Sequence, residues 1–193
     1  MIRDLIIKNR SYRRFYQDVT VDMSTLQDLV DLARQSPSAA NKQPLKYILS
    51  NQPAVNELIF SQLAWAGYLQ DWHGPGEGER PAAYILLLAD RKISRAIDCD
   101  HGIAAQSILL GAAEIGLGGC ILSSIDREKV SEALDIPSDL EILLAIALGK
   151  PKETVIIEEM PEDGDIKYWR DVEGRHHVPK RSLSEIVSAE FSA

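Results

Sequence analysis

The chain has 193 residues, of which 45% are hydrophobic and 26% are charged, so it can bury one sizeable core. Its formal net charge of -8 argues against a general nucleic-acid binder, which would carry a basic face. No apolar run approaches the roughly 20 residues that span a bilayer, and the N-terminus lacks the apolar stretch of a signal peptide, so we expect one cytoplasmic domain over residues 1–193 and no membrane partner.

The first half of the chain predicts a long helix and a buried strand. A short helical stretch comes first, and apolar residues then recur at helical spacing over residues 24–35, which predicts an amphipathic helix. The apolar run at residues 45–50 is bounded by turn residues, as is typical of a buried strand. Residues 71–81 contain three glycines and two prolines and should form a mobile loop.

The second half predicts further strands around a buried helix. Residues 82–89 and 141–148 are apolar runs that indicate buried strands, and residues 120–123 are a candidate fourth strand. Residues 102–116 are apolar or small on nearly every side, which predicts a helix buried in the core or in a subunit interface. The polar C-terminal tail should end in an amphipathic helix over residues 182–191.

Two early polar segments could bind a ligand. Residues 10–15 hold three arginines and a serine, and guanidinium groups bind phosphate through charge-assisted hydrogen bonds. A solvated basic turn is the alternative. In the loop of residues 36–44, Ser38, Asn41 and Gln43 could contact the edge of a polar heterocycle, with two prolines stiffening the loop. An ordinary turn is the alternative there.

Two later segments carry weaker signals. The glycines of residues 116–120 permit close approach of a flat ligand, although a helix C-cap explains them equally well. Lys180 and Arg181 could add positive charge near a phosphate, or could be ordinary surface residues.

The sequence does not favour a metal site. Residues 98–101 read Asp-Cys-Asp-His, but adjacent residues rarely point at one ion, and no Cys-x-x-Cys or His-x-x-x-His spacing is present. We expect Asp98 and Asp100 to cap the buried helix instead. His176 and His177 should face solvent. Both cysteines, at positions 99 and 120, are expected to be buried thiols rather than a disulfide.

Taken in order, these segments resemble the nitroreductase family of FMN-dependent oxidoreductases. The basic N-terminal pattern of that family is similar to Asn9–Phe15, and its Pro-Ser-Ala-x-Asn-x-Gln-Pro loop is similar to Pro37–Pro44. The buried family helix that ends in Leu-Gly-Leu-Gly corresponds to Ala112–Gly118, and the basic pair before its last helix corresponds to Lys180–Arg181. The resemblance extends from residue 1 to about residue 190.

The resemblance implies an α+β fold, with a mixed and largely antiparallel sheet flanked by helices. It also implies an intertwined homodimer with FMN at the interface. The implied FMN-binding residues are Arg10, Ser11, Arg13, Pro37, Ser38, Ala39, Asn41, Gln43, Leu122, Ser123, Ser124, Lys180 and Arg181.

The resemblance assigns these residues to different parts of the cofactor. The N-terminal group and the late basic pair would hold the phosphate and the ribityl chain. The loop would line the flavin, with Ser38 and Ala39 reaching it from the partner subunit, and the backbone of residues 122–124 would face the reactive ring edge. Asn9 stands where many members have an arginine, so either one positive charge at the phosphate is missing or Arg14 or Lys180 supplies it.

The implied reaction transfers electrons from NADH or NADPH through FMN to a small organic acceptor, such as a nitroaromatic or a quinone, by a ping-pong mechanism. No side chain is expected to act as an acid or a base. Lys42 and Arg13 are candidates for a positive charge near flavin N1.

Two alternatives stay open. The first is an FMN-binding carrier or redox sensor without efficient turnover. The second is a related flavoenzyme with a different reaction, such as reductive dehalogenation or fragmentation of the flavin. Leu45 and residues 121–124 depart from the usual family residues, and a change of reaction would show there.

Overall fold

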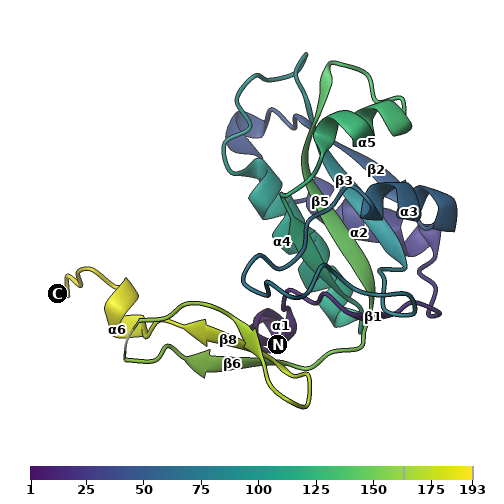
Figure 1. The fold of residues 1–193 in the computed structure, drawn as a ribbon. Helices are drawn as coiled ribbons and strands as arrows, with labels where there is room; N and C mark the ends of the chain where they lie inside the picture. The colour runs from purple at the N-terminus through teal and green to yellow at the C-terminus, as the bar shows by residue number, and fades with distance from the viewer. Residues whose placement is uncertain (163, 193) are drawn as a thin grey trace. The chain divides into compact units, whose positions relative to one another are not determined.

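The computed structural model describes residues 1–162 and 164–192 in two compact units. The first, here called the sheet unit, comprises residues 1–65 and 74–152. The second, here called the arm unit, comprises residues 66–73 and 153–193. Figure 1 shows the course of the chain through the helices and strands of each unit.

A five-stranded sheet forms the centre of the sheet unit (Figure 1). Its longer strands are β2 (Leu45–Ser50), β3 (Ala83–Asp90) and β5 (Leu140–Pro151), and the shorter ones are β1 (Phe15–Tyr16) and β4 (Gly118–Leu122). The order is β1-β5-β3-β2, with β4 also paired to β5, and each of these pairings is antiparallel. The four strands expected from the sequence are therefore confirmed, with bounds that shift by a few residues.

Two helices, α2 (Met23–Arg34) and α4 (Asp100–Glu114), pack against the same face of this sheet. Their apolar side chains form one core with Ile85 and Leu87 of β3 and with Ile146 of β5. Both helices were expected at nearly these bounds. Within the single chain α4 is not buried on every side, because the face that carries the polar Gln106 is exposed. Burial of that face in a subunit interface stays a prediction.

Three shorter helices complete the sheet unit. They are α1 (Ile2–Lys8), α3 (Pro53–Phe60) and α5 (Arg127–Ala133), and the single-turn helix η1 spans Ala39–Asn41. Proline at the first position starts α3, and the Asp126 carboxylate caps α5 by accepting the Lys129 N–H. Residues 74–81 form no helix or strand, as their glycines and prolines predict.

The arm unit contains a second, three-stranded sheet. Strand β8 (His176–Lys180) lies between β6 (Val155–Glu159), which is parallel to it, and β7 (Trp169–Arg170), which is antiparallel. The predicted α+β class, with mixed and largely antiparallel strand pairing, is thereby confirmed. The last helix is shorter than expected, because α6 covers only Leu183–Ile186.

The histidines of β8 do not face solvent, contrary to expectation. His176 is 1% exposed, and the His177 ring stacks on Trp169 with the ring centroids 4.1 Å apart. His177 Nδ1 lies 2.9 Å from Glu158, and Nε2 lies 3.1 Å from Asp171, which also pairs with Arg175. Hydrogen bonds to Asp171 and then to Glu158 raise the pKa of His177, because both ring nitrogens face carboxylates.

The stabilisation of the arm unit by His177 should depend on pH. A raised pKa means that the contribution is complete below the ordinary value of 6.5 and is lost as pH rises through the raised value. His177→Gln should therefore speed amide exchange in β6 and β8 more at about pH 6 than at about pH 9. His73→Gln, which changes an exposed histidine of the same unit, serves as the control. Equal effects of His177→Gln at both pH values would contradict the argument.

Glycines determine how closely the helices and strands of the sheet unit approach one another. A Cβ on Gly119 would lie 2.5 Å from the Ala147 carbonyl oxygen and 2.8 Å from Leu109 Cδ2, so β4 can pair with β5 under α4 only with glycine there. A Cβ on Gly111 of α4 would lie 2.4 Å from Leu32 Cδ1 of α2. The Gly116 backbone has φ +78°, which ends α4 in the way a C-cap glycine does.

Gly119→Ala should lower the free energy of unfolding by about 1–3 kcal/mol, because the backbone oxygen of Ala147 cannot move aside cheaply. Chemical denaturation monitored by circular dichroism measures the change. Gly76→Ala is the matched control, since a Cβ added there would meet no atom within 4 Å, and it should change stability by about 0.5 kcal/mol at most. Equal denaturation midpoints for the two variants would show that β4 can move away from β5 and α4 at little cost.

Candidate functional site

The basic N-terminal segment runs beside β4. Ser11 forms a parallel bridge with Gly119, and the Tyr12 N–H donates to the Gly119 carbonyl at 3.0 Å. The Tyr12 hydroxyl donates to the Lys8 carbonyl at 3.0 Å, which ties the segment back to α1. These bonds fix the backbone from which the arginine side chains project.

Arg14 is held in a structural ion pair. Its Nε and Nη2 each lie 2.6 Å from a carboxylate oxygen of Glu79, and Lys152 Nζ lies 3.2 Å from the same carboxylate. The hydrogen bond from Arg14, opposed by burial and assisted by Lys152, lowers the pKa of Glu79 to about 2. The sequence-based suggestion that Arg14 supplies charge to a phosphate is therefore unsupported, because its guanidinium already has a bidentate partner.

Arg10 has a different environment. Its Nη2 donates to the Ile6 carbonyl at 2.6 Å, while its Nε is buried and has no hydrogen-bond partner within the described residues. Leaving a buried donor without an acceptor costs about 1–3 kcal/mol. Arg13 lies nearby in sequence and donates from Nη1 to the Ser11 carbonyl at 3.3 Å. An anionic oxygen is the kind of acceptor that would satisfy the Arg10 donor.

The loop between α2 and β2 has an unusual backbone. Ala40, Asn41 and Gln43 all have positive φ, at 49°, 54° and 52°, although none is glycine. Each left-handed residue of this kind costs of order 1 kcal/mol or more, and such residues cluster at functional sites. The side chains of Asn41 and Gln43 are exposed at the tip of this loop.

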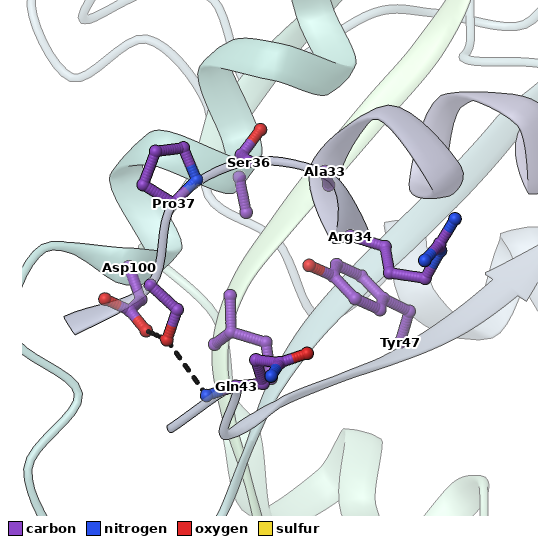
Figure 2. Close-up of a pocket in the computed structure, with 10 residues that line it drawn as sticks. Ala33, Arg34, Ser36, Pro37, Gln43, Tyr47 and Asp100 are labelled. Atoms are coloured by element: carbon purple, nitrogen blue, oxygen red, sulfur yellow. Dashed lines mark hydrogen bonds between the residues drawn. The ribbon is translucent and has the colours of Figure 1, made fainter. Parts of the chain in front are cut away.

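A buried carboxylate holds the loop. Asp100, which is 4% exposed, accepts a hydrogen bond from Ser38 Oγ at 2.6 Å on one oxygen and from the Ala39 N–H at 2.9 Å on the other. The Gln43 N–H in turn donates to Ser38 Oγ at 2.9 Å (Figure 2). Asp100 therefore does not cap α4 as expected; the residue at the N-cap is Cys99, and it makes no side-chain cap bond.

A hollow of about 160 Å³ lies behind this loop. Figure 2 shows Asp100 on one side of it and Tyr47 of β2, with Arg34 of α2, on the other. Burial raises the pKa of Tyr47 to about 12, and the charge of Asp100 adds to the shift, so the phenol stays protonated. The lining of the hollow therefore combines hydrogen-bonding side chains with apolar ones such as Ala33, Leu45 and Ala104.

The remaining predicted residues occupy two other places. Leu122 is buried at the end of β4, while the carbonyls of Ser123 and Ser124 accept hydrogen bonds from Arg127 Nη2 and from the Ala64 N–H. Lys180 and Arg181 belong to the arm unit, where Arg181 Nη1 pairs with Glu185 at 2.7 Å.

The two main candidate segments lie at opposite ends of α4. The loop is bound to Asp100 in the first turn, whereas Lys8, just before the basic segment, donates from Nζ to the Ala113 carbonyl at 2.8 Å in the last turn. An α-helix rises 1.5 Å per residue, so these anchor points are about 20 Å apart. A single chain thus presents the two segments separately rather than as one closed site.

Other kinds of site find little support in the described part of the chain. No group of three or more His, Cys, Asp or Glu side chains there could hold a metal ion. No helix within residues 1–162 and 164–192 has the length and apolar character needed to cross a membrane. Cys120 is a buried thiol as expected, whereas Cys99 is exposed.

Comparison with known proteins shows the family. The model of the nitroreductase family matches residues 6–150, so the chain belongs to this family of oxidoreductases. It is similar to 5,6-dimethylbenzimidazole synthase of Rhodospirillum rubrum, with 25% identity and coverage of 80% of this chain and 84% of that protein. It is also 23% identical to the oxygen-insensitive NADPH nitroreductase of Helicobacter acinonychis, covering 77% of this chain and 86% of that one.

Solved structures agree with this fold. A protein from Desulfovibrio desulfuricans, whose structure was solved in complex with FMN, superposes with a TM-score of 0.72 over 100% of this chain and 98% of its own. The two sequences are 20% identical, so this likeness concerns the fold.

Sequence reasoning missed the structural role of Asp100. A signal was present in the sequence, because an acidic residue begins a largely apolar helix and the preceding residue, Cys99, is not a capping side chain. Nothing in the spacing, however, links position 100 to position 38, since only the packing of α2 beside α4 brings them together.

Proposed function

We propose that the protein binds FMN and transfers electrons from NADH or NADPH to a small organic acceptor such as a nitroaromatic or a quinone. The observation that carries the proposal is the buried Arg10 Nε, a donor without a partner among the described residues, in the segment where the family resemblance expects the FMN phosphate. Ser11 and Arg13, which share that segment, would complete the phosphate contacts, joined by Lys180 and Arg181.

The loop would contact the flavin. Asn41 and Gln43 present exposed amide groups that can donate to or accept from the polar edge of the ring. Pro37, Ser38 and Ala39 would form the wall next to it. The backbone of residues 122–124 would face the opposite, reactive edge of the ring.

Bound FMN supplies the redox chemistry of such a site, accepting electrons from a reduced nicotinamide and passing them to the acceptor. The side chains of this protein would bind FMN, orient it and supply positive charge around it. We propose that either Lys42 or Arg13 supplies positive charge near flavin N1. No acid or base among the side chains is required for this chemistry.

The proposed site needs two subunits. The separation of about 20 Å along α4 supports an arrangement in which the loop of one subunit contacts an FMN whose phosphate is held by the other. Exposed apolar side chains on the sheet unit, Ile2, Ile6, Ile7 and Ile115, support a subunit interface near α1 and the end of α4. In the arm unit, Leu183 and Phe191 are also exposed apolar side chains. Burial of these side chains against a partner subunit would fit an intertwined dimer.

The first experiment is anaerobic reduction of the purified protein loaded with FMN. Bleaching of the flavin bands by NADH or NADPH, followed by recovery on addition of a quinone or nitroaromatic, is the expected result. Bound flavin that either nucleotide reduces no faster than free FMN would favour a carrier or sensor. A protein that cannot be loaded with FMN would overturn the proposal. Consumption of the flavin itself during aerobic turnover would point to flavin fragmentation instead.

Removal of one phosphate-binding group sharpens this test. Arg10→Gln should weaken FMN binding by about 10- to 100-fold, because it removes charge-assisted hydrogen bonds. Arg95→Gln removes a charge of the same kind outside the proposed site and should leave the FMN affinity unchanged. Equal affinities of the two variants would remove Arg10 from the site.

The dimer is tested separately. Ile6→Asp should shift the protein from dimer to monomer in analytical ultracentrifugation and should also weaken FMN binding, since it places a charge in the proposed apolar interface. Leu58→Asp, on the exposed surface of α3, is the control and should change neither property. A native protein that is monomeric with FMN bound would contradict the two-subunit site.

A further inference from the structure

Asp100 is buried, and within the described residues the hydrogen bonds of its carboxylate go to the loop that we propose to contact the flavin. Its two carboxylate oxygens accept from Ser38 Oγ at 2.6 Å and from the Ala39 N–H at 2.9 Å. No Lys, Arg or His within the described residues forms an ion pair with it. Hydrogen-bond donors of the loop and the positive end of the α4 dipole therefore stabilise this charge.

The bonds to Asp100 act where the backbone is strained. The left-handed residues Ala40, Asn41 and Gln43 follow directly after the two donors of the carboxylate. Ser38 links the two ends of the strained stretch, because its hydroxyl donates to Asp100 and accepts from the Gln43 N–H at 2.9 Å. Without these bonds the loop would relax toward ordinary backbone angles.

The same bonds limit what Ser38 itself can do. A hydroxyl has one hydrogen and two acceptor lone pairs. The hydrogen is donated to Asp100, and one lone pair accepts the Gln43 N–H. Ser38 can therefore offer a ligand only one remaining acceptor position, so its main contribution is to the shape of the loop. The exposed amides of Asn41 and Gln43 are the groups left to contact a ligand.

We propose that Asp100 is a positioning residue for FMN binding: it holds residues 38–43 in the strained conformation that presents Asn41 and Gln43 to the flavin. The proposal rests on the proposed FMN site and assigns Asp100 no contact with the flavin itself. Because α4 carries Asp100 in its first turn, the position of the loop is set by the packing of the helix.

The test measures two properties of each variant. The first is amide exchange of residues 38–43 in the FMN-free protein, and the second is the dissociation constant for FMN, from quenching of flavin fluorescence. Asp100→Ala removes both acceptors. Ser38→Ala removes the link to Gln43 and covers the case in which Asp100→Ala fails to fold. Asp98→Asn is the control, since Asp98 is exposed, lies two residues away and already has a positive φ, which Asn tolerates.

Asp100→Ala and Ser38→Ala should each speed exchange of the loop and weaken FMN binding by about tenfold or more, whereas Asp98→Asn should change neither. Adding Ala40→Gly to Asp100→Ala should restore part of the FMN affinity, because glycine removes the backbone penalty at one left-handed residue. A general structural defect would not be repaired by Ala40→Gly.

The outcomes separate the inference from the proposed function. A native protein that fails to bind FMN overturns both. Native FMN binding together with unchanged loop exchange or unchanged affinity in Asp100→Ala and Ser38→Ala overturns only the role of Asp100. A third outcome would also overturn the inference. If Asp100→Ala lowers the FMN affinity, loses the native sedimentation coefficient and is not improved by Ala40→Gly, then Asp100 serves general folding.

Discussion

Close packing of α4 against α2 and the central strands is the constraint on which the rest of the sheet unit depends. Gly111 lets Leu32 of α2 approach the helix backbone, and Gly119 lets β4 pair with β5 beneath the helix. A closely packed protein interior does not deform continuously, so side chains carried by α4 are held in fixed positions. The helix therefore fixes Asp100 at its start and the contact with Lys8 near its end.

Much of this architecture can be predicted from the sequence, because it follows from periodicity and from glycine. The runs that became β2, β3 and β5 contain several consecutive apolar residues, and β3 and the middle of β5 are buried at nearly every position, as such runs predict. The amphipathic spacing of α2 gave its bounds within one residue. The family resemblance, carried by the basic segment and the Pro37–Pro44 loop, agrees with the match over residues 6–150.

Other features could not be predicted, because they depend on contacts between distant positions. The strands of the arm unit are short, with two to five residues each. They depend on contacts that no local sequence pattern predicts, such as the placement of His177 between Glu158 and Asp171. The same holds for Arg14, which resembles its neighbours in sequence but is distinguished by Glu79, 65 residues away. The assignment of the FMN-binding residues remains a prediction.

The placement of the loop and the basic segment at opposite ends of one rigid helix has a consequence for mixed assemblies. If each FMN takes its phosphate contacts from one subunit and its loop from the other, every site combines two different parts of two copies of the same chain. A heterodimer of one subunit with a defective basic segment and one with a defective loop would then contain one fully intact site and one doubly defective site. Two inactive variants would regain activity on mixing, with one of the two sites intact in each heterodimer that forms, whereas a site built within one subunit would regain none.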